Sequence, residues 1–520
     1  MPMGGILPCK PVKSSWCALL ICFGGLLVAL PCRGADGDYR SAGSGNWNAV
    51  GTWQVESNST WVPPAATPTS ANGAIIIRTG HTVTVTAAVS VDQTVVEGGG
   101  QITLNSGVNL TIANGTGTDL DIFGTVEILG NFYGSTGTTV IQSGGVMRNA
   151  GTIYSSAASL SLAAGGTYRH VRNGGAIPTA TWDAASTCEI TGVTSTLPTA
   201  TGFTQSFGHL AWNCPSQTAG LNLNGNLKTI NGDFHMVSTG SGSLWLVNYT
   251  ASALVLNVAG HYIQSGGYLI FYYGSSTGYA GSMTMNVSGG FTLSSGLFNL
   301  SDSDRPGTLN VAGDFTHTGG TITERYNSYG TVNFNGSDSQ AFTSGGINSN
   351  IIHYAVSSGA TVLLGTQLLG NGSSGTFTLN AGATLIIGDA GGITTSGASG
   401  NIRVTGTRTY NTNANYVYDG TVAQDSGNGL TGANNLTITN SAGVSLSGSV
   451  TVSDTLALAS GNLSIGANTL TLNGAIDQTA GGLTGGASAN IVMNGSGAAT
   501  TLPTVELNNL TVNRGNGITL

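Results

Sequence analysis

Charged side chains are scarce in this sequence, and the few that are present exclude a whole class of partner. Only 7% of the 520 residues are charged, against roughly 25% in an ordinary soluble domain. Acidic residues outnumber basic ones by 22 to 14, which gives a net charge of −8 at pH 7. Lys228 is the only lysine beyond the N-terminal segment. Because nucleic-acid phosphates are bound by clustered Lys and Arg, we expect no nucleic-acid partner.

Cysteine is also rare, and its positions exclude a zinc site. Four of the 6 cysteines lie within the N-terminal segment 1–35, which leaves Cys188 and Cys214. Neither belongs to a C-x-x-C motif or to a Cys/His cluster of the kind that binds zinc. Their separation in the sequence is close to one turn of the repeat described below. Because an exported protein can keep a disulfide, we predict a bond between them.

A long apolar run occurs only at the N-terminus. Residues 16–30 are apolar, and they follow two lysines and precede small residues. This order is typical of a secretory signal peptide, so we assign residues 1–35 to one, with cleavage after Gly34 or Ala35. Lipidation of Cys32 is the alternative. The run is too short for a comfortable membrane span. We therefore expect a mature chain without a membrane span, secreted or held at the outer cell surface.

The remaining sequence alternates short strands with glycine-rich turns. Segment 81–86 (His-Thr-Val-Thr-Val-Thr) alternates apolar and polar residues with a period of two, as a half-buried strand does. Gly-Gly, Asn-Gly and Ser-Gly pairs, which are typical of turns, separate such runs. Thr, Ser and Val dominate where a helix would need better helix formers. The sequence therefore predicts an all-β protein.

Internal repeats indicate how the strands are arranged. Segments 256–267, 285–296 and 309–320 align directly with one another. A repeat this short cannot bury its apolar face alone, so neighbouring repeats must stack. We therefore predict an elongated right-handed parallel β-solenoid, or β-helix. Tandem β-sandwiches are the alternative, although such domains repeat at roughly 80–100 residues.

The repeat also divides the chain into domains. Residues 36–75 contain Trp47, Trp53 and Trp61 and match no repeat. We predict that they form an N-terminal cap, because the first turn of a solenoid otherwise exposes apolar side chains and a strand edge. Residues 76–520 form the repeat region. Its last segment, 509–520, copies 435–446 and stops in mid-repeat, so we expect a longer protein with further repeats downstream.

Several motifs resemble a known group of proteins. They are Ser44-Gly-Asn-Trp47, the stretch 74–86, Cys188-Glu-Ile-Thr-Gly192 and Gly313-Asp-Phe-Thr-His-Thr-Gly-Gly320. Together they resemble the secreted β-strand-repeat surface proteins typical of Bacteroidota and related bacteria, a group similar to adhesins. The resemblance implies a structural or adhesive role at the bacterial cell surface. Surface glycans or other cell-surface proteins would then be the partners.

The sequence shows no set of residues suited to catalysis. A β-helix lyase needs a basic residue and usually Asp-bound Ca²⁺, and a glycosidase needs two carboxylates within about 5–10 Å. Lys228 and the dispersed acidic residues provide neither arrangement. We therefore expect a non-catalytic protein without a cofactor, and a carbohydrate-degrading β-helix is the alternative. Asp302 and Asp304 are interpreted as a solvated turn, with weak Ca²⁺ binding as the other interpretation.

Aromatic residues suggest where a carbohydrate could bind. Six of them lie between positions 262 and 279, and Tyr268, Tyr272 and Tyr273 are the candidates for stacking on sugar rings. Since side chains of a strand alternate between its faces, one of the two adjacent tyrosines must point outward. Trp47 and Trp53 of the cap are further candidates. A carbohydrate-binding β-helix is therefore the alternative to a purely structural role.

Overall fold

The computed structural model describes residues 34–248, 250, 252–274, 281–302, 304–325, 328–496 and 499–520. The predicted signal peptide lies outside the described residues, apart from its last two positions. Within the described ranges the only helical segments are the short 3₁₀ helices η1 (Val50–Thr52) and η2 (Ala200–Thr204). Stacked parallel strands form a β-solenoid of about 20 turns. The prediction of an all-β solenoid is confirmed, and the tandem-sandwich alternative is wrong because the repeats pair in parallel.

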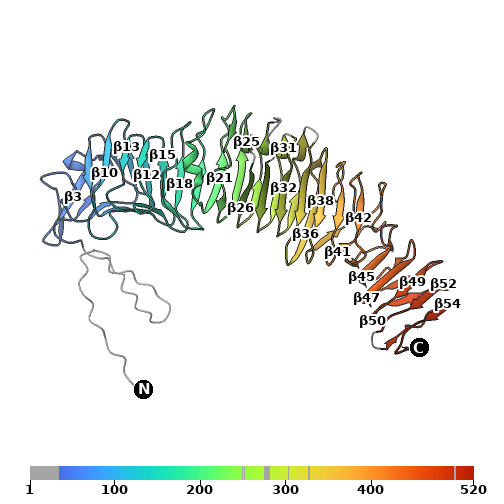
Figure 1. Ribbon diagram of the computed structural model, residues 1–520. Coiled ribbons are helices and arrows are strands. Elements are labelled where there is room, and N and C mark those ends of the chain that lie inside the picture. The colour runs from blue at the N-terminus through green and yellow to red at the C-terminus, as the bar shows by residue number, and fades with distance from the viewer. Residues whose placement is uncertain are drawn as a thin grey trace, which may run out of the picture. The chain divides into compact units, whose positions relative to one another are not determined.

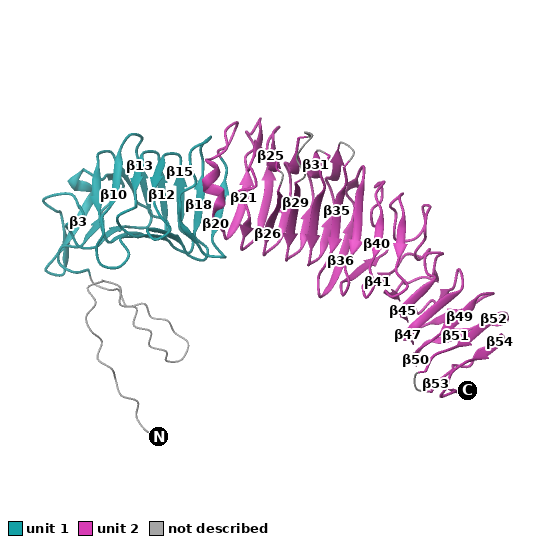
Figure 2. Ribbon diagram, viewed as in Figure 1, with its two compact units in different colours: residues 1–191 teal, residues 192–520 magenta. Residues whose placement is uncertain are grey.

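The chain divides into two compact units, residues 1–191 and 192–520, which are teal and magenta in Figure 2. Within each unit, strands of successive turns lie side by side (Figure 1). No helix in the described part of the chain is long and apolar enough to cross a membrane.

Unit 1 contains three parallel sheets, and most turns add one short strand to each sheet. The first sheet holds β5 (Ile75–Ile77), β8 (Thr94–Val96), β11 (Leu120–Ile122), β14 (Thr139–Ile141), β17 (Leu160–Leu162) and β19 (Thr181–Trp182). The second holds β2 (Gly45–Asn46), β6 (Thr82–Val85), β9 (Gln101–Leu104), β12 (Thr125–Ile128), β15 (Val146–Asn149), β18 (Thr167–His170) and β20 (Thr187–Ile190). The third holds β7 (Val89–Val91), β10 (Asn109–Ile112), β13 (Asn131–Tyr133) and β16 (Thr152–Tyr154).

An antiparallel hairpin covers the N-terminal edge of the first sheet. Strand β1 (Tyr39–Ser41) pairs with β5 in parallel, and β3 (Trp53–Ser57) and β4 (Thr60–Val62) follow in antiparallel pairing. The edge of β5 is thereby satisfied by backbone hydrogen bonds, as a capped solenoid requires. Trp47 and Trp53 pack edge to face in this N-terminal segment, with ring centroids 4.8 Å apart.

Unit 2 begins with the same three-sheet arrangement. Its first sheet holds β21 (His209–Asn213), β24 (Phe234–Ser238), β27 (Tyr262–Gln264), β30 (Phe291–Leu293), β33 (Phe315–His317) and β36 (Ser339–Ser344). The second holds β22 (Gly220–Asn222), β25 (Ser243–Asn248), β28 (Tyr268–Tyr273), β31 (Leu297–Asp302), β34 (Thr321–Arg325) and β37 (Ile347–Asn348). The third holds β23 (Thr229–Ile230), β26 (Ala253–Val258), β29 (Ser282–Val287), β32 (Gly307–Val311), β35 (Gly330–Phe334), β38 (Ile352–Val356), β40 (Phe377–Leu379) and β42 (Arg408–Tyr410).

The stack changes register at β36. Phe342 pairs back to β33, whereas Ser339–Ala341 pair forward to β39. From there one sheet continues through β39 (Thr361–Gly365), β41 (Thr384–Ile387), β43 (Asn415–Tyr418), β45 (Gly432–Ile438), β47 (Val450–Leu458), β49 (Thr469–Leu472), β50 (Ala475–Gln478), β52 (Gly486–Met493) and β54 (Leu507–Val512). A smaller sheet holds β44 (Gln424–Asp425), β46 (Val444–Ser445), β48 (Asn462–Ser464) and β51 (Gly482–Thr484), and β53 (Thr500–Thr501) pairs with β55 (Ile518–Thr519).

The three aligned repeats of the sequence stack directly on one another. Leu256, Met285 and Leu309 are in register, and all three are fully buried. A second buried column consists of aromatic rings in register, Phe234, Tyr262, Phe291, Phe315 and Phe342. From Tyr262 onward its rings are stacked, with centroids 4.8–5.6 Å apart. Burying each such side chain contributes roughly 1.5–3 kcal/mol, so the columns supply the core that no single turn could build.

The polar residue of the repeat forms an outer ladder. Asn286 donates to Asn257, Asn310 to Asn286 and Asn333 to Asn310, with N···O distances of 2.7–3.1 Å. The hydroxyl of Ser357 donates to Asn333 at 2.9 Å and ends the ladder. Side-chain amides thus link turns that the backbone already joins.

Candidate functional site

A pair of stacked aromatic rings lies on the second sheet of unit 2. Trp245 of β25 and Tyr273 of β28 are both partly exposed, with ring centroids 3.8 Å apart and planes at 11°. The indole N–H donates to the hydroxyl of Ser243 at 2.8 Å, which fixes the ring orientation. Gly220 of β22 lies against the indole, where a Cβ atom would come within 2.3 Å of Trp245 Cζ2. The ring therefore occupies space that only glycine leaves.

Polar groups of the next two turns lie beside this pair. Tyr268 of β28 is partly exposed, and its hydroxyl accepts a hydrogen bond from Asn299 at 3.3 Å. Tyr273 is in register with Asp302 of β31, which in turn is in register with Arg325 of β34. We call these six residues the aromatic strip: Trp245, Tyr268, Tyr273, Asn299, Asp302 and Arg325.

The charged pair of the strip is unequally exposed. The side chain of Asp302 is 7% exposed, that of Arg325 is 51% exposed, and Oδ1 of Asp302 lies 4.0 Å from Nε of Arg325. This oxygen is buried and has no hydrogen-bond partner among the described residues. Burial raises the pKa of Asp302, and Arg325 partly offsets that effect. Burial also raises the pKa of Tyr268, so its hydroxyl stays protonated at neutral pH and can donate. The strip thus combines partly exposed aromatic rings with the hydroxyl of Tyr268 and the exposed guanidinium of Arg325, whereas Asn299 and Asp302 are buried.

Three of the five glycan-stacking candidates need correction. Tyr272 is 1% exposed and points inward, where its hydroxyl donates to the carbonyl of Thr250 at 2.9 Å. Trp47 and Trp53 are 2% and 1% exposed, and their indole N–H groups donate to the carbonyls of Pro68 and Trp47. Buried rings whose N–H groups are already bonded cannot stack on a ligand. These three residues therefore belong to the core.

The sequence prediction missed Trp245. It lies on the turn before Tyr273, outside the aromatic cluster between positions 262 and 279. The length of this turn is what places Trp245 near the tyrosines, because Trp245 is in register with Ile270 of the following turn. Counting one turn back from the tyrosines would have indicated it.

The structure does not bring Asp302 and Asp304 together as a calcium site. Asp302 faces Arg325, whereas Asp304 is about half exposed and lies 3.4 Å from Nε of Arg305. No group of three or more His, Cys, Asp or Glu side chains suited to a metal ion occurs in the described ranges. The exposure of Asp304 agrees with the turn interpretation, whereas Asp302 is buried and forms an ion pair with Arg325.

Cys188 and Cys214 are both buried thiols. Cys188 is in register with Tyr168 in unit 1, and Cys214 follows strand β21 in unit 2. Burial raises the pKa of both thiols, that of Cys214 to about 11. The disulfide between them stays a prediction.

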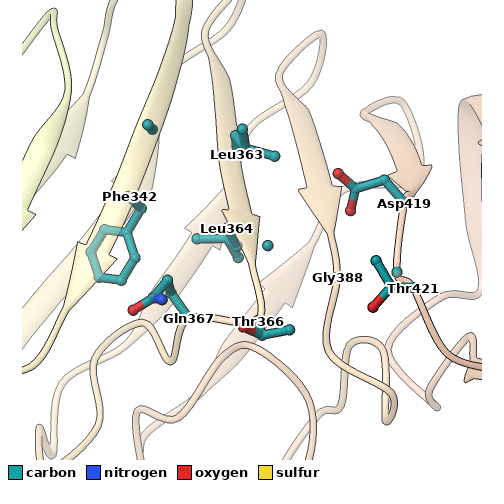
Figure 3. A pocket seen from close by; sticks show the side chains of 11 residues that line it. Phe342, Leu363, Leu364, Thr366, Gln367, Gly388, Asp419 and Thr421 are labelled. Carbon is teal, nitrogen blue, oxygen red and sulfur yellow. The ribbon is translucent and has the colours of Figure 1, made fainter.

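A groove of about 460 Å³ opens where β36 changes its pairing (Figure 3). Phe342, Leu363 and Leu364 line one part of it, and Asp419 and Thr421 lie across from the leucines. Oδ1 of Asp419 is buried without a hydrogen-bond partner in the described part of the chain, and burial raises the pKa of this carboxyl. Asp419 is the sole ionisable residue of the lining. The groove can accept a hydroxyl group, but its lining lacks the second carboxylate that glycoside hydrolysis needs.

No protein-family model and no curated protein matches the chain.

Proposed function

We propose that this protein is a secreted, non-catalytic repeat protein with a structural or adhesive role at the cell surface, and that it adheres by binding glycans at the aromatic strip. The observation that carries the proposal is the partly exposed Trp245–Tyr273 stack beside Arg325. Gly220 and Tyr273 lie against the indole, so a sugar would contact the exposed edges of the two rings, while neighbouring polar groups bond its hydroxyls. The strip offers both kinds of contact on one sheet face.

The ladders of the solenoid support the structural part of the proposal. Buried aromatic rings and outer asparagines repeat at the same place in successive turns. Such repetition builds a stiff scaffold, and in repeat proteins binding is spread over the surface of that scaffold. The one carboxylate of the strip, Asp302, faces Arg325, and this pairing favours binding over acid–base chemistry. A carbohydrate-degrading β-helix is the alternative.

A glycan array with the mature chain (residues 36–520) tests the proposal. We expect binding to a subset of glycans, weakened about fivefold to tenfold by Trp245→Ala or Tyr273→Ala, since a lost aromatic contact is worth about 1 kcal/mol. Tyr329→Ala is the matched control, because Tyr329 is 46% exposed and its ring meets His353 edge to face rather than stacking. Binding that survives both strip substitutions, or no binding to any glycan, would overturn the proposal. Release of reducing sugar from a bound glycan would favour the degrading alternative.

A further inference from the structure

The outward-pointing side chains of the third sheet of unit 1 are uncharged. Leu110, Ile112 and Phe132 point into the core and are fully buried. The alternate positions therefore point outward, and they form two rows across the sheet. One row is Asn109, Asn131 and Thr152, and the other is Ser90, Thr111, Tyr133 and Tyr154.

The second row ends in a stacked and exposed pair of tyrosines. The rings of Tyr133 and Tyr154 are 4.7 Å apart with planes at 6°, and Tyr154 is 46% exposed. Strand β16, which carries Tyr154, is the last strand of this sheet. Because no further strand of this sheet follows β16, Tyr154 is the last ring of the stack.

Amide and hydroxyl groups lie alongside these rings. Asn131 donates to Asn109 at 3.1 Å, so its carbonyl oxygen stays available as an acceptor. Thr152 is exposed on β16, two positions before Tyr154. Positions two apart on a strand are separated by roughly 6–7 Å, which is the scale of one sugar ring. The face thus pairs aromatic rings with a parallel row of neutral hydrogen-bonding groups.

We propose that this face is a second carbohydrate-binding surface, and that it binds a neutral polysaccharide. One sugar ring would stack on Tyr154, and hydroxyls of the chain would bond Asn131 and Thr152. None of the members of the two rows is charged, so none of them can pair with a uronate or a sulfate. This surface differs in that respect from the aromatic strip, which carries Arg325 and Asp302. The adjoining cation, Arg172, donates to the backbone carbonyl of Gly151.

Affinity electrophoresis of the mature chain tests the proposal, with hydroxyethylcellulose, galactomannan and laminarin as neutral probes and alginate as an acidic one. We expect at least one neutral polysaccharide to retard the protein. Tyr154→Ala should weaken that retardation about fivefold to tenfold. Tyr329→Ala, which removes an equally exposed tyrosine, and Trp245→Ala, which removes the strip, should leave it unchanged.

Three results would overturn the inference. They are no retardation by any neutral probe, equal retardation of Tyr154→Ala and the unaltered chain, and loss of retardation in Trp245→Ala alone. The last result would leave the aromatic strip as the binding surface and the proposed function intact. If Tyr154→Ala has a lower melting temperature than the unaltered chain, Thr152→Glu is the variant that tests the surface. It keeps both tyrosine rings and places a charge in the adjoining row. Unchanged retardation of Thr152→Glu would then reject the surface.

Discussion

The indole of Trp245 lies face to face with the phenol of Tyr273, with 3.8 Å between ring centroids, although the two residues belong to different turns. Gly220 of the preceding turn makes room for the indole. Three consecutive turns therefore determine where this ring lies. The arrangement exists only because the turns stack.

Gly220→Ala should weaken glycan binding without removing any group of the strip. The new Cβ would come within 2.3 Å of Trp245 Cζ2 and force the indole out of its place between Gly220 and Tyr273. We expect a loss of about fivefold in glycan affinity, close to that of Trp245→Ala. The array used for the strip measures it. Gly448→Ala is the control, since a Cβ at Gly448 meets nothing within 4 Å, and equal binding by the two variants would contradict the prediction.

Asn310→Ala should destabilise unit 2 more than a neighbouring substitution does. The Asn310 side chain donates to Asn286 and accepts from Asn333, so its loss breaks two links of the ladder. We expect the free energy of unfolding to fall by about 1–2 kcal/mol, measured by urea denaturation. Thr308→Ala, on the same strand and two positions earlier, is the control. Equal effects of the two substitutions would show that the ladder adds nothing.

Gly145→Ala should be among the most damaging single changes in unit 1. A Cβ at Gly145 would come within 1.9 Å of the carbonyl oxygen of Ile122 in the previous turn, and backbone cannot move aside cheaply. We expect a loss of at least about 2 kcal/mol in unfolding free energy, since overpacking typically costs about 1–3 kcal/mol. A Cβ at Gly43 meets open space, so Gly43→Ala should change stability by less than about 0.5 kcal/mol. Similar melting temperatures for the two variants would reject this packing.

Two carboxyl groups of unit 1 should make stability depend on pH. Burial and a hydrogen bond with Asp119 raise the pKa of Asp92 to about 6. Burial pushes the pKa of Asp119 upward, but hydrogen bonds from the Thr138 N–H, from Asp92 and from the Gly115 N–H outweigh it and lower this pKa. In the unfolded chain both groups titrate near about pH 3.9. Asp92 thus holds a proton in the folded state that it loses on unfolding between about pH 4 and 6.

Unfolding free energy should therefore fall as the pH rises from about 4 to 6, and it should also fall below about pH 4, where Asp119 becomes protonated. Asp92→Asn keeps a hydrogen-bond donor without the charge, so it should stabilise the protein at pH 7 by on the order of 1 kcal/mol, allowing for partial exposure. Asp119→Asn should destabilise the protein by about 1–3 kcal/mol, because the amide keeps one acceptor oxygen and one of two backbone N–H groups therefore loses its acceptor. Urea titrations at pH 3, 4, 5, 6 and 7 measure the pH profile and the effects of both substitutions. A flat profile for the unaltered chain would contradict the coupling.

Cys188 and Cys214 should react slowly with a thiol reagent while the protein is folded. Both are buried with a raised pKa, and only the thiolate is nucleophilic. Unfolding the protein in the same reagent then distinguishes reduced cysteines from a disulfide. Both thiols react if the cysteines are reduced as in the structure, and neither reacts if the protein forms the Cys188–Cys214 disulfide predicted from spacing. Fast labelling of the native protein would contradict the burial.

Local pattern was enough to predict the strands and their stacking. Alternation with a period of two marks which side chains of a strand are buried, and this follows from backbone geometry alone. The aligned residues Leu256, Met285 and Leu309 therefore stack as the repeats indicated. The Trp-rich segment likewise folds over the first strand edge, because an unpaired edge and exposed apolar rings are both costly.

Composition and alternation specify an all-β, repetitive solenoid with little charge and a few aromatic clusters, whereas the stacking of the turns selects which aromatic rings meet solvent. Because Tyr272 and Tyr273 are adjacent on a strand, one of them has to face outward. In the folded chain Tyr272 is buried and Tyr273 is the outward one. The fold also buried Trp47 and Trp53, joined Trp245 to the strip, and paired Tyr133 with Tyr154.

The physical reason is that stacking depends on the length of each turn, and the turns of this chain differ in length. The asparagine ladder shows the variation, because its step from Asn257 to Asn286 spans more of the sequence than its step from Asn286 to Asn310. Alternation within a strand is a local property, so the sequence alone can specify it. Which side chains of successive turns become neighbours depends on the path of the intervening loops, and only the folded chain fixes that path.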